Sequence, residues 1–289
     1  MTADNLTFHP SPKTPDIVLP DEACDAHCHV FGPAARFPFA PERTYTPVDA
    51  PKEKLFALHR LLGISRTVLV QASCHGTDNA AMLDAIAADP ERVRGIAMVR
   101  PDISEADLKA LDAGGVRGVR FNFVTHLGAD ANLDAVRATV RKIADLGWHA
   151  VVHFDAKKLP DLAPFLREIP VPMVIDHMGR VDASLGVEQE AFRLLLDLME
   201  DERFWVKVCG SERVSRAGPP FHDAVPFARR LVETFPDRVL WGTDWPHPNI
   251  KVHMPDDGAL VDLLPLMAPT DALMRALLVD NPTRLYWAD

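Results

Sequence analysis

Residues 23–30 read ACDAHCHV, an apolar run that closes on two histidines. In an extended strand alternate side chains share a face, so His27 and His29 point to one side and Cys28 to the other. Two imidazoles on one buried face are costly unless they have a partner or a function. The run therefore predicts a first strand that carries functional side chains at its carboxyl end.

Seven further apolar runs follow, at spacings that suit repeated strand–helix units. The eight predicted strands are residues 23–30, 67–73, 94–99, 116–123, 149–154, 172–177, 204–209 and 239–243. Segments of helical period lie between them, at residues 52–62, 79–88, 105–113, 133–146, 159–166, 188–199 and 224–235. This alternation indicates an α/β fold, a single (β/α)8 TIM-type barrel, with an open doubly wound sheet as the alternative. No glycine-rich nucleotide-binding motif follows the first strand, which disfavours the open sheet.

The length of 289 residues suits one barrel, which we assign to residues 21–289, after an extended N-terminal segment at 1–20. The long segment 31–50 is expected to form a wall or lid of the active site. Four scattered cysteines, with no Cys-x-x-Cys pair, are expected to be reduced and buried.

The net charge of −10 argues against nucleic acid or an anionic membrane as a partner. The polar, proline-rich N-terminus lacks the pattern of a secretory signal, and no apolar stretch is long enough to span a membrane. The cytoplasm is therefore the expected compartment. The sequence leaves the oligomeric state open, and a homo-oligomer is compatible with it.

Histidine and aspartate also stand at the ends of three later strands. The fifth strand ends at His153, the sixth at Asp176 and His177, and the eighth at Asp244 of GTDWPHP, residues 242–248. Because the carboxyl ends of barrel strands face the active site, these side chains are expected to converge. Imidazole and carboxylate are ligands that suit Zn²⁺, and less specifically Mn²⁺ or Fe²⁺. A metal-bound water has a pKa of about 7, and an adjacent Asp can take its proton.

This pattern resembles the amidohydrolase superfamily, of the amidohydrolase 2 type. Longer stretches are similar to its branch of 2-pyrone-4,6-dicarboxylate lactonases and 4-sulfomuconolactone hydrolases, at residues 25–33, 70–79, 118–123, 174–180, 241–249 and 281–287. The similarity covers essentially the whole chain. It implies a barrel of the amidohydrolase kind and hydrolysis of a cyclic ester in the bacterial breakdown of aromatic compounds.

The resemblance also implies roles for single residues. Asp244 would activate water, while His27, His29 and His177 would polarise the lactone carbonyl. The implied substrate-binding residues are the cations Arg120 and Arg213, with Arg216 as the alternative to Arg213, the neutral donors Tyr45 and Ser73, and His126. A guanidinium group pairs bidentately with a carboxylate or sulfonate, which suits an anionic lactone.

Two positions depart from the pyrone lactonase pattern, which has a Tyr where this chain has His153 and an Arg where it has His126. Pyrone lactonases work without a metal, but His153 restores the metal set His27, His29, His153 and Asp244 of mononuclear members. We therefore expect one divalent metal, Zn²⁺ first and Mn²⁺ second, while metal-free operation stays open. The change at His126 leaves the second anion of the lactone open, as either a sulfonate or a carboxylate.

Two other function classes remain as alternatives. A metal-dependent decarboxylase, which is a lyase acting on an unsaturated carboxylic acid, could use the same barrel. A barrel that only binds an anionic metabolite is the non-enzymatic alternative. The sequence disfavours the binding protein, because such a protein has no need of a base like Asp244 beside a cluster of imidazoles.

Overall fold

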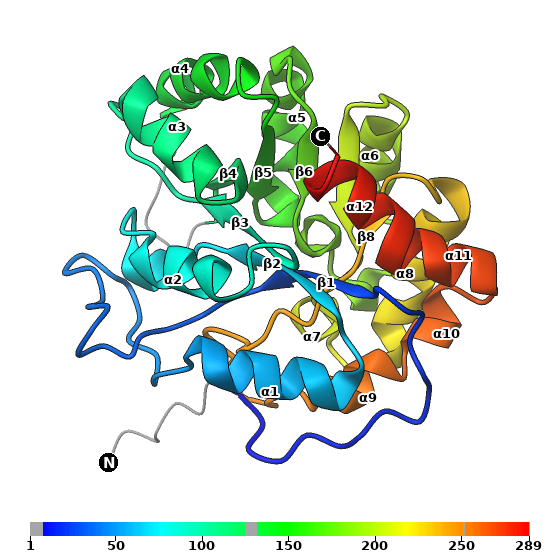
Figure 1. The fold of residues 1–289 in the computed structure, drawn as a ribbon. Helices are drawn as coiled ribbons and strands as arrows, with labels where there is room; N and C mark the ends of the chain where they lie inside the picture. Colours follow the sequence, from blue (N-terminus) through cyan, green and yellow to red (C-terminus); the bar gives the residue numbers. More distant parts are fainter. Residues whose placement is uncertain (1–7, 125–131, 251, 289) are drawn as a thin grey trace.

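The computed structural model describes residues 8–124, 132–250 and 252–288. Its parallel strands lie in the order β1 to β8, and helices surround them (Figure 1). The strands are β1 (Cys24–Cys28), β2 (Arg66–Val70), β3 (Val93–Ala97), β4 (Val116–Asn122), β5 (His149–His153), β6 (Met173–Ile175), β7 (Phe204–Lys207) and β8 (Val239–Leu240). This order confirms the (β/α)8 barrel.

Helices follow the strands as crossovers, and a group of short helices follows β8. The crossovers are α1 (Lys52–Leu62), α2 (Ala80–Ala88), α3 (Glu105–Ala113), α4 (Leu133–Ala144), α5 (Leu159–Glu168), α6 (Glu190–Met199), α7 (Ser211–Val214) and α8 (Val225–Thr234). The short helices are α9 (Asp257–Val261), α10 (Leu264–Met267), α11 (Asp271–Arg275) and α12 (Asn281–Tyr286). Over the described ranges, no helix is both long and apolar enough to cross a membrane.

The barrel is closed by hydrogen bonds between β1 and the segment after β8. The amide of Ala26 donates to the carbonyl of Trp241 at 2.8 Å, and the amide of Asp244 donates to the carbonyl of His27 at 2.8 Å. The buried carboxylate of Asp25 adds a tie, because it accepts from both the amide and the hydroxyl of Thr243. These bonds bring the first and last strand ends, which carry His27 and Asp244, into direct contact.

All eight strands end one to three residues earlier than the sequence predicts, and β6 and β8 are the shortest. β6 ends at Ile175, because His177 and Met178 adopt positive φ angles of 51° and 52°. β8 ends at Leu240, and Asp244 beyond it has a φ of 63°. Left-handed backbone in residues other than glycine is uncommon and clusters at functional sites. In β6 and β8 the chain thus leaves the sheet shortly before His177 and Asp244.

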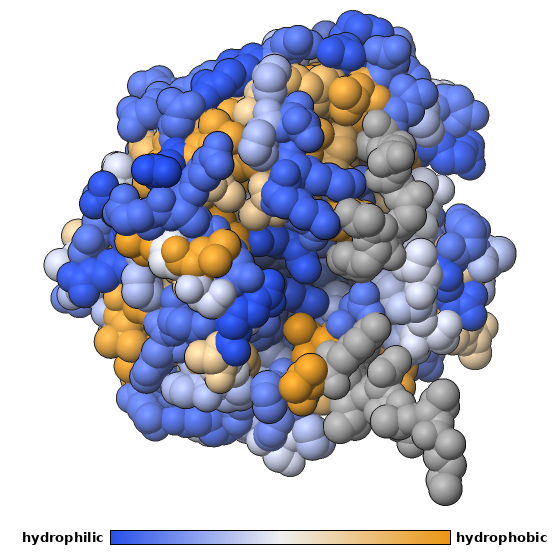
Figure 2. Space-filling view, turned by 180° about the vertical axis from the view of Figure 1, so that it is seen from behind, coloured by the Kyte–Doolittle hydropathy of each residue, from blue (hydrophilic) through white to orange (hydrophobic). Residues whose placement is uncertain are grey.

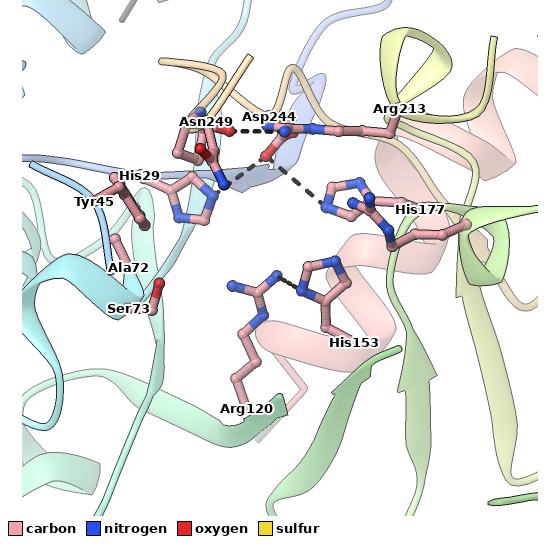
Figure 3. Close-up of a pocket in the computed structure, with 12 residues that line it drawn as sticks. His29, Tyr45, Ala72, Ser73, Arg120, His153, His177, Arg213, Asp244 and Asn249 are labelled. Carbon is pink, nitrogen blue, oxygen red and sulfur yellow. Dashed lines mark hydrogen bonds and ion pairs between the residues drawn. The ribbon is translucent and has the colours of Figure 1, made fainter. Parts of the chain in front are cut away.

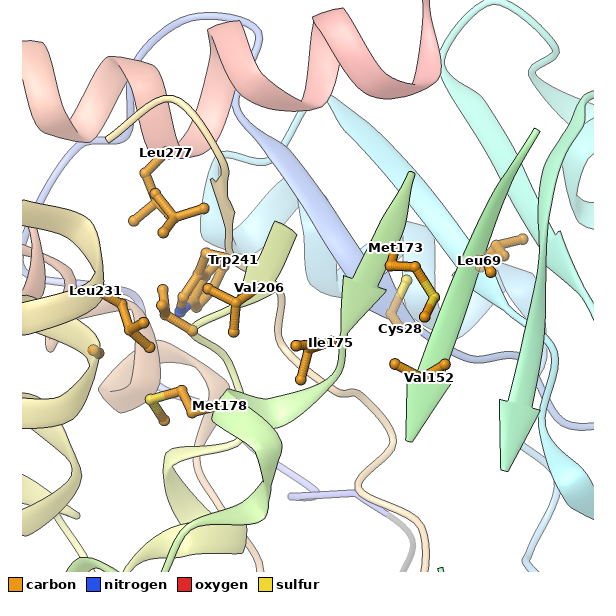
Figure 4. Packing of buried hydrophobic residues seen from close by; sticks show 14 of the residues in the cluster. Cys28, Leu69, Val152, Met173, Ile175, Met178, Val206, Leu231, Trp241 and Leu277 are labelled. Carbon is orange, nitrogen blue, oxygen red and sulfur yellow. The ribbon is translucent and has the colours of Figure 1, made fainter. Parts of the chain in front are cut away.

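Apolar side chains form one layer between the barrel and the helices and a second inside the barrel. Figure 4 shows the outer layer, where Leu231 and Leu277 face strand residues such as Val206. The inner cluster includes Ala26, Val174 and the buried ring of Tyr286. All four cysteines are free and buried. The Sγ of Cys28 lies 3.0 Å from the hydroxyl of Thr67, away from the imidazoles, as strand alternation predicts.

Candidate active site

A pocket opens at the carboxyl ends of the strands, with about 410 Å³ of empty space when the open solvent at its mouth is included. Figure 2 shows a hollow with hydrophilic residues near the middle of one face, and Figure 3 shows pocket side chains converging. The residues that line it are His29, Tyr45, Ala72, Ser73, Arg120, His153, His177, Arg180, Arg213, Asp244, Pro248 and Asn249. Tyr45 comes from the segment 31–50, which therefore forms part of the wall.

Asp244 lies at the centre of the site and is 1% exposed. Its Oδ2 accepts from Arg213 Nε at 2.7 Å. Its Oδ1 lies 3.3 Å from His29 Nε2, 3.5 Å from His27 Nε2 and 3.9 Å from His177 Nε2. Burial alone would raise the pKa of Asp244, but the charge of Arg213 and the imidazoles hold that pKa well below its ordinary value. The side chain is therefore a carboxylate at neutral pH.

His29 shows that the site suits a bound cation. Its Nδ1 donates to the carbonyl of Val70 at 2.7 Å, so in the neutral ring Nε2 carries a lone pair. That lone pair faces Asp244 Oδ1 at 3.3 Å, and a carboxylate oxygen offers only lone pairs. Two acceptor atoms at this distance repel each other unless a proton or a metal ion lies between them.

The ligand-capable atoms of His27, His177 and Asp244 lie within 4.8 Å of one another. Burial lowers the pKa of His177 to about 3, so its imidazole is neutral and able to ligate. His153 is outside this group, and its Nδ1 instead faces Arg120 Nη2 at 3.1 Å. The donor set thus fits a metal on the carboxylate and the neighbouring imidazoles better than on His153.

Two other groups of ligand-capable side chains lie nearby, and internal bonds already occupy them. In the first, Asp25 accepts from His59 and Thr243. The second contains Glu212, Asp244 and His247, and the guanidinium of Arg213 contacts both carboxylates. His247 faces Asp257 Oδ1 at 3.1 Å, and although burial opposes it, that carboxylate and Glu212 raise the pKa of His247 to about 10. His247 is therefore an imidazolium that packs behind the pocket.

A buried ion cluster lies beneath the imidazoles. Asp176 accepts from Arg120 Nε at 2.9 Å and lies 3.3 Å from Lys207 Nζ. Lys207 is fully buried at the end of β7 and reaches His27 Nδ1 at 2.9 Å. Although burial opposes it, the charges of Lys207 and Arg120 hold the pKa of Asp176 well below its ordinary value. Sequence reasoning missed Lys207, although a lysine within an otherwise apolar strand is the signal that could have found it.

The arginines divide into those in the pocket and those outside it. Arg120 and Arg213 both line it, as predicted, but Arg213 is bonded to Asp244 and donates to the carbonyl of Pro248. Arg216, the alternative, is exposed and pairs with Asp182 instead. Arg180 lines the pocket without having been singled out, although it lies within the family-like stretch 174–180.

The structure also shows where two of the remaining predicted substrate-binding residues lie. Tyr45 and Ser73 line the pocket, and burial raises the pKa of Tyr45, so its phenol stays neutral. His126 lies outside the described residues. Asn249, which sequence reasoning did not single out, adds an amide to the wall.

Comparisons with known proteins agree on one family. Residues 24–287 match the amidohydrolase family. A 2-pyrone-4,6-dicarboxylate hydrolase of Comamonas testosteroni is 53% identical, over 98% of this chain and 96% of that protein. A 4-sulfomuconolactone hydrolase of Hydrogenophaga intermedia is 41% identical, over 93% and 90%. The crystal structure of a probable 2-pyrone-4,6-dicarboxylic acid hydrolase of Acinetobacter baumannii, with citric acid bound, has a TM-score of 0.82 and 30% identity, covering 92% of this chain and 100% of that one.

Proposed function

This chain belongs to the amidohydrolase family, and we propose that it is a lactone hydrolase that opens the ring of a small anionic lactone in the breakdown of aromatic compounds. The resemblance inferred from the strand ends is thereby confirmed. The observation that carries the proposal is the ionised, buried Asp244, which faces three imidazoles in a pocket that also holds three arginines. The two relatives named above act on lactones that carry two anionic groups.

The base of the reaction is Asp244. Arg213 holds Oδ2, so Oδ1 is the oxygen left to accept a proton from the attacking water. The water oxygen forms a bond to the lactone carbonyl carbon, and the ring C–O bond then breaks. Asp244 returns the proton to the departing ring oxygen, which leaves an acyclic acid. Imidazole N–H groups facing the pocket would stabilise the negative charge that develops on the carbonyl oxygen.

A divalent metal would be held by Asp244 with His27 and His177, and His29 Nε2, 3.3 Å from Asp244 Oδ1, would add a further imidazole. Neutral imidazoles and a carboxylate suit Zn²⁺ best and Mn²⁺ second. Such an ion, when bound, polarises a carbonyl and lowers the pKa of water. His153, which the sequence also assigned to the metal, stays a prediction, and the contact of its Nδ1 with Arg120 weighs against it.

The anionic groups of the lactone would be bound by the pocket arginines. Arg120 and Arg180 lie on the wall, and Arg213 adds charge from α7. Ser73 and Asn249 supply neutral hydrogen-bonding groups around them. The protein as a whole has a net charge of −10, so it is the positive charge of the pocket arginines that would attract a small anion.

Turnover of 2-pyrone-4,6-dicarboxylate and of 4-sulfomuconolactone tests the proposal directly. We expect loss of the lactone with release of a proton from at least one of the two. Asp244→Asn should lower kcat by about 10²- to 10⁴-fold, because the base is lost while the shape is kept. The exposed Asp197, which pairs with Arg167, gives the matched control Asp197→Asn. Near-normal turnover by Asp244→Asn would remove the base from the mechanism, and release of CO₂ would indicate a lyase.

A further inference from the structure

The two cations of the buried ion cluster, Lys207 and Arg120, contact imidazole rings of the site as well as Asp176. Lys207 Nζ lies 2.9 Å from His27 Nδ1, and Arg120 Nη2 lies 3.1 Å from His153 Nδ1. One carboxylate therefore anchors two cations, and each cation faces one ring. Figure 3 shows the Arg120–His153 contact.

The chemistry of these donors determines which ring nitrogen carries the proton. Ammonium groups donate hydrogen bonds and accept none, so the Nδ1 atom of His27 accepts from Lys207. The Nδ1 atom of His153 also faces Asn122 Oδ1 at 3.2 Å, so its contact with Arg120 does not by itself fix the proton there. A ring nitrogen that accepts a hydrogen bond carries no proton, so a His27 ring that accepts at Nδ1 from Lys207 is neutral. A neutral imidazole has one N–H, and it must then lie on Nε2.

Both Nε2 atoms are buried and have no hydrogen-bond partner among the described residues. His27 Nε2 lies 3.5 Å from Asp244 Oδ1, at the edge of the reaction centre. An Nε2–H there donates to an oxygen, whereas a metal ligand needs a lone pair on the same atom. The two states of His27 are therefore mutually exclusive.

A competing partner for His27 lies in the same cluster. Asp176 Oδ1 lies 3.2 Å from His27 Nδ1 and 3.3 Å from Lys207 Nζ, so the ring and the ammonium group share this oxygen. If Nδ1 donated to this carboxylate, Nε2 would carry the lone pair that a metal requires, in the arrangement common to metal-binding histidines. Lys207 occupies Nδ1 instead and prevents this.

We propose that Lys207, anchored by Asp176, is a positioning residue that fixes His27 as an Nε2–H donor and thereby weakens divalent metal binding at the site. The inference rests on the proposed function only in taking Asp244 and its imidazoles as the reaction centre. In this barrel, the buried charge of Lys207 thus favours the hydrogen-bonding form of His27 over the metal-binding form.

The tautomer of His27 can be measured in the metal-free protein. Long-range ¹H–¹⁵N correlation spectra of ¹⁵N-histidine-labelled protein distinguish the two neutral forms, and His27→Gln identifies the signal. We expect an Nε2–H ring in the wild type. In Lys207→Met, which keeps an unbranched side chain one atom shorter and removes its charge, we expect an Nδ1–H ring bonded to Asp176.

Zinc affinity gives the second readout, by competition with a chromophoric chelator at pH 7. Changes in the partners of metal-binding histidines alter affinity by about 10- to 100-fold, and we expect Lys207→Met to bind Zn²⁺ more tightly by that factor. The control is Lys158→Met, because Lys158 Nζ donates to the carbonyl of Phe123 and contacts none of these imidazoles. Its zinc affinity should equal that of the wild type.

An Nδ1–H ring at His27 in the wild type, or a Lys207→Met protein that binds zinc no more tightly than the wild type, would overturn the proposal. If Lys207→Met does not fold, the wild-type tautomer decides alone. Neither measurement uses a lactone, so this failure is distinct from that of the proposed function, which would show as absence of turnover in the wild type.

Discussion

Asp244 is the residue at which opposing physical effects meet. Complete burial disfavours a carboxylate, yet Arg213 contacts Oδ2 and holds the pKa of Asp244 well below its ordinary value. The same pairing directs Oδ1 toward the imidazoles. A base held in this way stays ionised to a lower pH than an ordinary Asp, but its basicity is reduced. Arg213 is therefore expected to set the pH range of the enzyme as well as the charge of the pocket.

Replacing Arg213 by Met should move the acid limb of the pH–rate profile upward. In the wild type the limb lies below the ordinary Asp pKa of about 4, because the paired carboxylate protonates only at low pH. Without Arg213, burial dominates and raises that pKa, so kcat at saturating lactone should fall as pH drops toward 5. The profile between pH 4.5 and 8 measures this shift. Arg216→Met, at an exposed pair with Asp182, is the control, and identical profiles for both variants would contradict the assignment.

The elements explain how much of the site the sequence could reveal. His27, His29 and Asp244 were found because barrel topology requires all strands to present their carboxyl ends at one face. The pairings of these residues were not predicted. Lys207 was missed, and Arg213 was expected to bind substrate rather than Asp244, because the two pairs span 180 and 31 residues of sequence. The strand ends at Ile175 and Leu240 were also not predicted. The left-handed backbone at His177 and Asp244 leaves no mark in the pattern of apolar residues from which the strands were predicted.

The turn between β7 and α7 supports His177 and provides a test at this scale. Gly210 has a φ of 77°, and a Cβ there would lie 2.6 Å from His177 Nδ1. Gly63, after α1, has a φ of 78° and no described atom within 4 Å of such a Cβ. Ala at either position should cost about 1–2 kcal/mol of unfolding free energy through left-handed strain. Only Gly210→Ala should also displace His177.

The two variants are compared by denaturant unfolding and by kcat/KM for the lactone. We expect similar losses of stability from backbone strain, with an added loss in Gly210→Ala from the contact with His177. A fall in kcat/KM of tenfold or more should appear in Gly210→Ala alone. Equal activity in both proteins would show that the position of His177 does not matter for the reaction.

On the scale of the whole molecule, the barrel buries an unusual number of ionisable groups. His27, His149, His153 and His177 are each at most 6% exposed, and burial lowers the pKa of all four. Folding therefore keeps these rings neutral, whereas the unfolded chain lets them titrate near pH 6.5. Keeping these rings neutral therefore lowers the stability of the folded protein at acidic pH. The carboxylates of Asp176 and Asp244 have lowered pKa values and lose their contribution only at a still lower pH.

Stability should consequently fall steeply as pH drops below 6.5. Below that value these histidines bind protons in the unfolded state but not in the folded state. The difference persists until the pH approaches the pKa of about 3 that His149 and His177 have in the folded protein. Each ring removes up to about 1.4 kcal/mol of unfolding free energy per pH unit, so the four together remove up to roughly 5.6 kcal/mol per pH unit. Tm measured with a chelator from pH 7.5 to 4.5 should show this decline. His149→Gln removes one ring outside the pocket and should reduce the slope by about a quarter, whereas a Tm that stays constant over this range would mean that these imidazoles are not held neutral.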